Sequence, residues 1–466
     1  MGKPAKRAIK SAVKDAKSLA QRIVAAPQLS APKDAKARFA KWLAEIGRSD
    51  AGKTLARLFK QHPKAAALIA ALADGSPYLF DLARADPARL AALLGADPDA
   101  RLDALLKASA RAVAATRDEA KAMAELRRMK AEAALLIALA DLGGVWPVMR
   151  VTQAVTELAD AAVGAAVRFL FADAARRGRI KPADKAKPEA DSGYVVLAMG
   201  KMGAHELNYS SDIDIIVFYQ PAPTLAVDTE ASAFYVRITR GLVKLLQERT
   251  ADGYVFRVDL RLRPDPASTQ IAVSTAAALD YYASVGQNWE RAALIKARPC
   301  AGDRGAGEAI LKELSPFIWR KYLDYAAVAD IEAMKRQIHA YQGHDDIAVE
   351  GHNIKVGRGG IREVEFFVQT QQLIAGGRHP ELRGRETLTL LNALADGGWI
   401  GKDAAVELDA AYRFLRQIEH RLQMVNDDQT HTLPSDRAGL ERFARFAGFK
   451  SGDAFATALT GHLRNV

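Results

Sequence analysis

The sequence predicts a mostly helical α+β protein, because helical spacing dominates both ends of the chain and two strand-like runs stand between them. Of the 466 residues, 49% are hydrophobic and only 7% are aromatic, and alanine is abundant, as is typical of helices. The strand-like runs lie within residues 194–219 and 253–264. A chain of this length exceeds one hydrophobic core, so two or three domains are expected.

Residues 32–179 show helical spacing interrupted by glycine and proline. Proline fits the first turn of a helix, so each break that contains one predicts a new helix start. The breaks are His62-Pro63, Gly75-Ser76-Pro77, Asp86-Pro87, Gly95 to Pro98 and Gly143-Gly144. We predict an all-helical lobe without catalytic residues, in which the charged run Arg127 to Lys130 is a solvated face.

The first strand-like run begins with apolar residues 195–199, which predict a buried strand. Gly200 and Gly203 then break the strand and open a short helix. A second strand is predicted from Asp212 to Tyr219.

The second strand begins with two acidic residues that share a face, because side chains alternate along a strand. These residues, Asp212 and Asp214, repel each other unless a cation such as Mg²⁺ lies between them. The alternative is that they only cap a turn. The Asp-x-Asp at Asp97 and Asp99 illustrates this, since it surrounds a proline at a predicted helix start.

The second strand-like run alternates strictly between polar and apolar residues from Phe256 onward. Its polar residues are predicted to share one face: Arg257, Asp259, Arg261 and Arg263. Such a face is either a solvated ladder of ion pairs or a third carboxylate completing a metal site beside phosphate-binding arginines. The two carboxylates already described favour the metal site.

The net charge of +11 and the isoelectric point of about 9.5 suit nucleic acid or an acidic protein surface. Part of this charge is local, because residues 1–22 hold seven Lys or Arg against one Asp. We expect a solvated basic helix there and no signal peptide, since an apolar core is missing. No apolar run approaches membrane-spanning length, and the single cysteine, Cys300, fits a reducing cytoplasm.

Two further segments leave alternatives open. Arg291 and Lys296 either contact phosphate or hold their lobe together. Gly357, Gly359 and Gly360 precede a predicted helix and either cradle an anion or form a tight turn, the default for this spacing.

The arrangement of Gly200, a gap of about ten residues and then Ser211-Asp212-x-Asp214 resembles the nucleotidyltransferase superfamily related to DNA polymerase β. Five blocks together resemble a narrower group, the glutamine synthetase adenylyltransferase/adenylyl-removing enzyme family, and in particular its N-terminal half. The blocks are residues 199–219, 252–264, 279–298, 353–383 and 423–434.

The resemblance implies a DNA polymerase β-like nucleotidyltransferase domain with a small mixed sheet, flanked by helical bundles. The implied domains are an N-terminal helical domain (1–185), a catalytic domain (190–315) and a C-terminal helical domain (316–466).

Full-length family members carry two such catalytic domains, and the N-terminal one removes AMP from a tyrosine of glutamine synthetase by phosphorolysis. Orthophosphate attacks the AMP phosphorus and ADP leaves, under stimulation by the uridylylated PII signal protein. The C-terminal domain adds AMP from ATP. This chain shows one strand-borne Asp-x-Asp site, so we expect removal without addition, and a cytoplasmic enzyme.

The resemblance also implies roles for individual residues. The catalytic residues and ligands of a two-metal Mg²⁺ site are Asp212, Asp214 and Asp259. Gly200, Lys201 and Ser211 are the implied phosphate contacts, although Lys201 stands where the wider superfamily has serine. Arg261 is expected to bind orthophosphate or the nucleotide. The proton donor to the leaving tyrosine is not identified.

Two alternative functions remain at this point. One is a template-independent nucleotidyltransferase acting on RNA, which shares the carboxylates but is disfavoured because the sequence shows no RNA-binding module. The other is a non-catalytic module that docks glutamine synthetase and PII, which would not need three repelling carboxylates.

Overall fold

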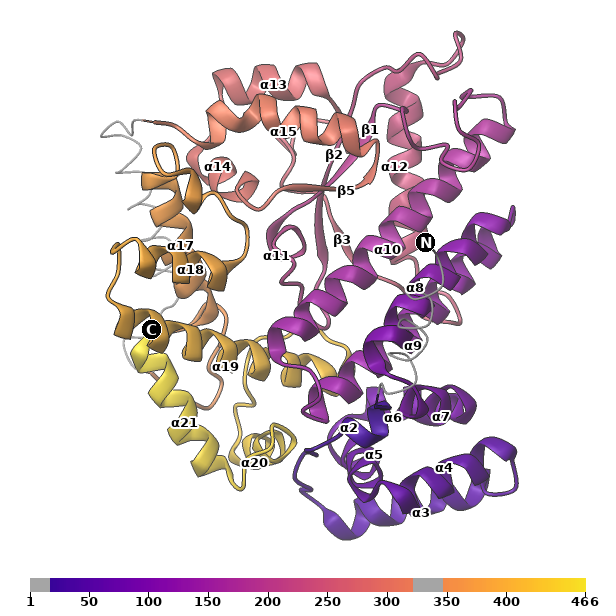
Figure 1. Ribbon diagram of the computed structural model, residues 1–466, viewed down its shortest axis with the longest axis vertical. Helices are drawn as coiled ribbons and strands as arrows, with labels where there is room; N and C mark the ends of the chain where they lie inside the picture. Colours follow the sequence, from indigo (N-terminus) through magenta and orange to yellow (C-terminus); the bar gives the residue numbers. More distant parts are fainter. Residues whose placement is uncertain (1–16, 322–346) are drawn as a thin grey trace, which may run out of the picture.

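The computed structural model describes residues 17–321 and 347–466, which form a mostly helical α+β fold around a small mixed sheet (Figure 1). The predicted fold class is confirmed. Most of the basic N-terminal segment and part of the predicted helical region after Pro316 fall outside the described residues.

A lobe of helices precedes the sheet, and several of its helices begin with proline as predicted. Ser76, Asp86 and Asp97 cap three of these starts by accepting hydrogen bonds from backbone N–H groups three residues later. The helices are α2 (Leu19–Arg22), α3 (Pro32–Ile46), α4 (Asp50–Gln61), α5 (Pro63–Gly75), α6 (Pro77–Ala85), α7 (Pro87–Gly95), α8 (Pro98–Ala115), α9 (Glu119–Leu142) and α10 (Val148–Arg176). In the described ranges, each helix is too short or too polar to cross a membrane.

The sheet has the strand order β3-β2-β1-β5, and β4 also pairs with β2. β1 is antiparallel to β2 and β5, whereas β2 is parallel to β3 and β4. The strands are β1 (Tyr194–Ala198), β2 (Ile213–Tyr219), β3 (Val258–Asp259), β4 (Val273–Ser274) and β5 (Arg298–Gly302). The helices between and after them are α11 (Gly200–Gly203), α12 (Ala231–Gln247), α13 (Thr275–Ser284), α14 (Asn288–Leu294) and α15 (Arg304–Ile318).

Both faces of the central strands are covered by helices, which explains why β1 is apolar at every position (Figure 1). Val195 and Leu197 pack in the core formed with α13, α14 and α15. Val196 and Ala198 belong to the core shared with α10 and α12. The sheet is therefore a rigid base for the residues at its ends.

A second set of helices follows the sheet and has a core of its own. The helices are α17 (Ile361–Ala375), the 3-10 turn η1 (Pro380–Leu382), α18 (Thr387–Asp396), α19 (Lys402–Asn426), α20 (Arg437–Phe446) and α21 (Gly452–Asn465). In Figure 1, α17 and α18 lie across from α11, at the end of the sheet where β2 begins.

The predicted strand at residues 253–264 is wrong in its length, because only Val258 and Asp259 pair with β2. The Asp259 carboxylate accepts a hydrogen bond from the backbone N–H of Arg261, and such a contact turns the chain. The arginines therefore do not share one face. Arg263 instead donates to backbone carbonyls on both sides of it in the chain, including those of Leu260 and Gln270.

The predicted solvated face at Arg127 to Lys130 is also wrong, since Arg127 and Lys130 are buried. Arg127 donates to the carbonyls of Leu245 and Glu248, at and just beyond the end of α12, and of Gly253. The guanidinium thereby supplies donors to carbonyls at the C-terminal end of α12, where the helix itself offers none, and adds a second donor to the Gly253 carbonyl, which already accepts from Thr250 N–H. The Lys130 ammonium lies 5.1 Å from the centre of the Phe256 ring.

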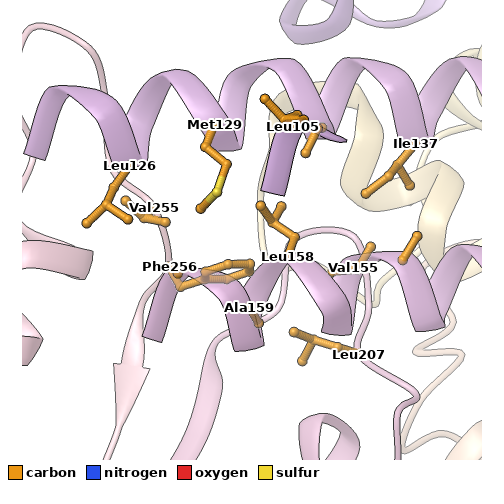
Figure 2. Close-up of a cluster of buried hydrophobic side chains, with 14 of the residues drawn as sticks. Leu105, Leu126, Met129, Ile137, Val155, Leu158, Ala159, Leu207, Val255 and Phe256 are labelled. Carbon is orange, nitrogen blue, oxygen red and sulfur yellow. The ribbon is translucent and has the colours of Figure 1, made fainter. Parts of the chain in front are cut away.

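The segment that leads into β3 is thus anchored on the helical lobe. Figure 2 shows Val255 and Phe256 lying against Leu126 and Met129 of α9 and Leu158 of α10. This packing fixes where the chain enters β3 and therefore where Asp259 lies.

Candidate active site

The three predicted carboxylates meet at one edge of the sheet. Asp212 directly precedes β2, Asp214 is the second residue of β2, and Asp259 is the last residue of β3. In the parallel pairing of these strands, Asp214 stands opposite Asp259. Two chain segments more than forty residues apart in sequence thus place acidic side chains together.

The charges of these carboxylates act on one another. Burial, followed by repulsion from Asp212 and Asp259, raises the pKa of Asp214 to about 6. Lys355 and Arg261 oppose this rise only in part. Asp214 is therefore a carboxylate whose negative charge is costly in the protein alone, and a nearby cation would relieve that cost.

The other two carboxylates are held by protein donors. Gln429 Nε2 donates to Asp212 Oδ1 at 2.7 Å, and Arg261 binds Asp259 through its backbone N–H and its guanidinium. Burial raises the pKa of Asp259, but these contacts with Arg261 bring it below the usual value. Over residues 17–321 and 347–466, no three His, Cys, Asp or Glu side chains are already grouped closely enough for a metal ion.

The space beside Asp214 nevertheless suits an added ion. Gly200 has a positive φ of +50°, and a Cβ atom there would lie 2.8 Å from Asp214 Oδ2. Glycine therefore keeps the space beside this carboxylate free of a side chain. The three residues offer oxygen donors alone, the donor type that Mg²⁺ prefers, so they fit this metal once Asp259 and Asp212 turn from their present partners.

The predicted phosphate contacts lie in different surroundings. Gly200 adjoins Asp214, and Ser211 is buried immediately before Asp212. The Lys201 ammonium is engaged elsewhere, because its Nζ lies 2.5 Å from Glu365 Oε1 of α17. The Arg261 side chain is 83% exposed and bound to Asp259.

Lys201 belongs to a buried cluster of charges that the sequence analysis missed. Lys201, Lys296 and Arg416 supply three positive charges, and Glu206, Glu365 and Glu419 supply three negative ones, all on side chains no more than 12% exposed. The Tyr412 hydroxyl lies within hydrogen-bond distance of both Glu206 and Glu365 and accepts from Arg416. The cluster ties α11 and the following turn to α17 and α19.

A signal for this cluster was present in the sequence. Ile361, Val364 and Val368 form the buried stripe of α17, and Glu365 lies four residues after Ile361 on that same stripe. A charged residue on the apolar face of a helix predicts a buried partner.

Two other arginines serve the structure around the site. Arg291 donates to the carbonyls of Phe317 and Ile318. Of the two alternatives for this residue, the structural one, in which it holds its lobe together, is confirmed. Arg257 donates to the Ser210 carbonyl and to the Tyr254 hydroxyl. It thereby supports the turn that leads into Asp212.

A mostly helical α+β chain with acidic residues at one edge of a small mixed sheet is the arrangement expected of a nucleotidyltransferase. Comparison with known proteins defines it further. Residues 64–313 match the profile of glutamate-ammonia ligase adenylyltransferase, and residues 330–466 match that of GlnD PII-uridylyltransferase. The chain belongs to the glutamate-ammonia ligase adenylyltransferase family.

Similar proteins named bifunctional glutamine synthetase adenylyltransferase/adenylyl-removing enzyme occur in several bacteria. The protein of Rhodopseudomonas palustris strain HaA2 is 59% identical over 96% of this chain and 45% of its own length. That of Bradyrhizobium diazoefficiens is 57% identical over 98% of this chain and 46% of its own length. The resemblance to this family is confirmed, and the chain spans less than half the length of these relatives.

Proposed function

We propose that this chain removes AMP from adenylylated glutamine synthetase by phosphorolysis. The observation that carries this proposal is the meeting of Asp212, Asp214 and Asp259 beside Gly200. Removal rather than addition is supported by the five sequence blocks, which resemble the N-terminal, AMP-removing half of the family. The relatives' names include both activities.

In the proposed reaction, an oxygen of orthophosphate forms a bond to the AMP phosphorus while the bond from that phosphorus to the tyrosine oxygen breaks. ADP and tyrosine are the products, and the phenolate, whose ordinary pKa is about 10, takes up a proton. Mg²⁺ held by Asp212, Asp214 and Asp259 would neutralise phosphoryl charge and align the attacking and leaving oxygens.

The residues of the chain would orient the substrate around these carboxylates. Gly200 lets a phosphoryl group come close to Asp214, because no side chain stands between them. Arg261 is exposed, and its side chain is long enough to leave the Asp259 carboxylate and bind phosphate oxygens instead. The paired N–H donors of its guanidinium match the geometry of a phosphate group.

We further propose a cytoplasmic enzyme that is stimulated by uridylylated PII. The match of residues 330–466 to PII-uridylyltransferase supports the link to PII.

The decisive experiment measures ADP formed from adenylylated glutamine synthetase, orthophosphate and Mg²⁺, with and without uridylylated PII. The wild type is expected to form ADP, and Asp212→Asn to reduce the rate about 10³-fold, the order found for losing one transition-state-stabilising group. Asp228→Asn, at an exposed aspartate, is the matched control and should leave the rate unchanged. Absence of ADP even with uridylylated PII would refute phosphorolysis, and Asp212-dependent AMP transfer from ATP would identify addition instead.

A second prediction concerns the competition between Arg261 and the metal for Asp259. Arg261→Ala should raise the affinity for Mg²⁺ up to about fivefold, a small effect because the ion pair is largely exposed. Calorimetric titration with Mg²⁺ in the absence of substrate measures this change. Arg240→Ala, an exposed arginine of α12, is the control. An unchanged or weaker affinity in Arg261→Ala would show that Arg261 does not compete with the metal.

A further inference from the structure

The glycine-rich loop before α17 does not bind an anion through its backbone. Gly357 N–H donates to Asn353 O, Gly359 N–H to Glu363 Oε1, and Gly360 N–H to Gly357 O. The tight turn, the default prediction for this segment, is confirmed. The N–H groups are used within the loop itself, so its contribution to a site must come from a side chain.

The loop holds one residue, Lys355, in a fixed position. Asn353 Oδ1 accepts hydrogen bonds from the N–H groups of Lys355 and Val356, both at 3.0 Å. The Lys355 carbonyl accepts from Arg362 N–H at 2.8 Å, and the neighbouring Ile354 N–H donates to His431 O at 2.9 Å. Hydrogen bonds within the protein therefore hold both the N–H and the carbonyl group of Lys355 in place.

The same anchors place this loop over the acidic residues. His431 follows Gln429 by two residues, and Gln429 donates to Asp212. On the other side of the loop, Glu365 of α17 holds Lys201, the neighbour of Gly200. The loop is thus linked to the acidic site on two sides, through Gln429 and Asp212 and through Glu365 and Lys201.

The positive charge of Lys355 acts on this site and is not ion-paired within residues 17–321 and 347–466. It favours the ionised form of Asp214 and disfavours the protonated form of Lys201. Within the described residues, no carboxylate comes within ion-pair distance of its ammonium, although the residue is half-buried. Lys201 and Arg261, by contrast, are already ion-paired.

We propose that Lys355 binds a phosphate oxygen of the substrate across from the three carboxylates. An anion between the ammonium and a metal-loaded carboxylate site would be attracted by both. The group recognised is a phosphate dianion, either free orthophosphate or the terminal phosphate of a nucleoside diphosphate. Because this is the phosphate of the reaction proposed above, the subsite rests on that proposed function.

Binding measurements test the subsite independently of turnover. With Mg²⁺ present, calorimetry compares orthophosphate, ADP and AMP binding to the wild type, Lys355→Met and Lys355→Arg. We expect Lys355→Met to weaken the binding of orthophosphate, ADP or both by about 10- to 100-fold, the value of a hydrogen bond to a charged group. AMP, which lacks the terminal phosphate, should be affected less, and Lys355→Arg should restore binding. Weakening of orthophosphate alone or of ADP alone would identify the source of the phosphate.

Controls separate a binding role from a structural one. Lys402→Met, at an exposed lysine of α19, should bind as the wild type does, and Mg²⁺ should still stabilise Lys355→Met, which would show that the acidic site is intact. In turnover, the KM for orthophosphate should rise while the KM for adenylylated glutamine synthetase stays constant. Unchanged binding of both orthophosphate and ADP to Lys355→Met would overturn the subsite. Lys355-dependent phosphate binding by a protein that forms no ADP would support the subsite and refute phosphorolysis.

Discussion

Replacing Asp214 with asparagine is expected to abolish AMP removal and, at the same time, to make the metal-free protein more stable at neutral pH. The first effect follows from losing a carboxylate of the proposed Mg²⁺ site and should reach about 10³-fold. The second follows from removing a buried negative charge that faces Asp212 and Asp259. Few substitutions combine a large loss of activity with a gain in stability, so the pair of effects is diagnostic.

The gain in stability should depend on pH in a defined direction. Burial and the neighbouring carboxylates raise the pKa of Asp214 to about 6, against 3.8 for an ordinary aspartate. Well below pH 3.8 the carboxyl is protonated in the folded and unfolded protein alike, so asparagine brings no gain. Between pH 3.8 and 6 the unfolded protein releases this proton while the folded wild type keeps it, so the wild type loses stability as the pH rises. The loss reaches up to roughly 3 kcal/mol and is complete above pH 6. The asparagine variant avoids that loss.

Urea unfolding between pH 4 and pH 8, with a chelator present, measures this difference. Mg²⁺ should then stabilise the wild type more than Asp214→Asn, since the metal needs the ionised carboxylate. The control is Asp228→Asn, which should follow the wild type at every pH. If Asp214→Asn were less stable than the wild type at pH 8 without metal, the ionised Asp214 carboxylate would not destabilise the folded protein, and the explanation by burial and repulsion would be wrong.

The parts of the fold and site that sequence predicts are those set by local geometry. Pro63, Pro77 and Pro87 mark helix starts, because the first turn of a helix does not need the backbone N–H that proline lacks. Asp212 and Asp214 share a face because strand side chains alternate. Neither rule needs knowledge of a distant segment.

The parts that sequence did not predict depend on specific side-chain contacts, most of them with distant segments. Asp259 ends its strand because its carboxylate bonds the N–H of Arg261, an event that alternation of residue types does not reveal. Arg127 lies in a charged run typical of a solvated face, yet it is buried because carbonyls near the end of α12 need donors. Gln429 reaches Asp212 from more than two hundred residues away. Each error arose where a specific side-chain contact, local or tertiary, overrode the pattern of residue types.

The largest loss of stability is expected for Glu365→Gln, because it unbalances the buried charge cluster. The change leaves Lys201, Lys296 and Arg416 facing only two carboxylates in a region that water does not reach. Removing one member of a buried ion pair typically costs about 3–5 kcal/mol, since the remaining charge is left without compensation. Urea unfolding at pH 7 measures the loss, and Glu407→Gln, at an exposed glutamate of α19, is the control.

A second substitution distinguishes charge imbalance from loss of packing. Burial raises the pKa of Glu365, but Lys201 and the other cations hold it well below the usual range, so the glutamate is ionised at neutral pH. Removing the facing cation with Lys201→Met should therefore restore much of the stability lost in Glu365→Gln, although it also breaks the link between α11 and α17. In a double-mutant cycle, the two losses should be far less than additive. Additive losses would mean that the two side chains act independently. Lys201 directly follows Gly200, which adjoins Asp214. The Lys201→Met variant should therefore also bind Mg²⁺ more weakly than the wild type. The charge cluster would then set the geometry of the acidic site as well as the stability of the fold.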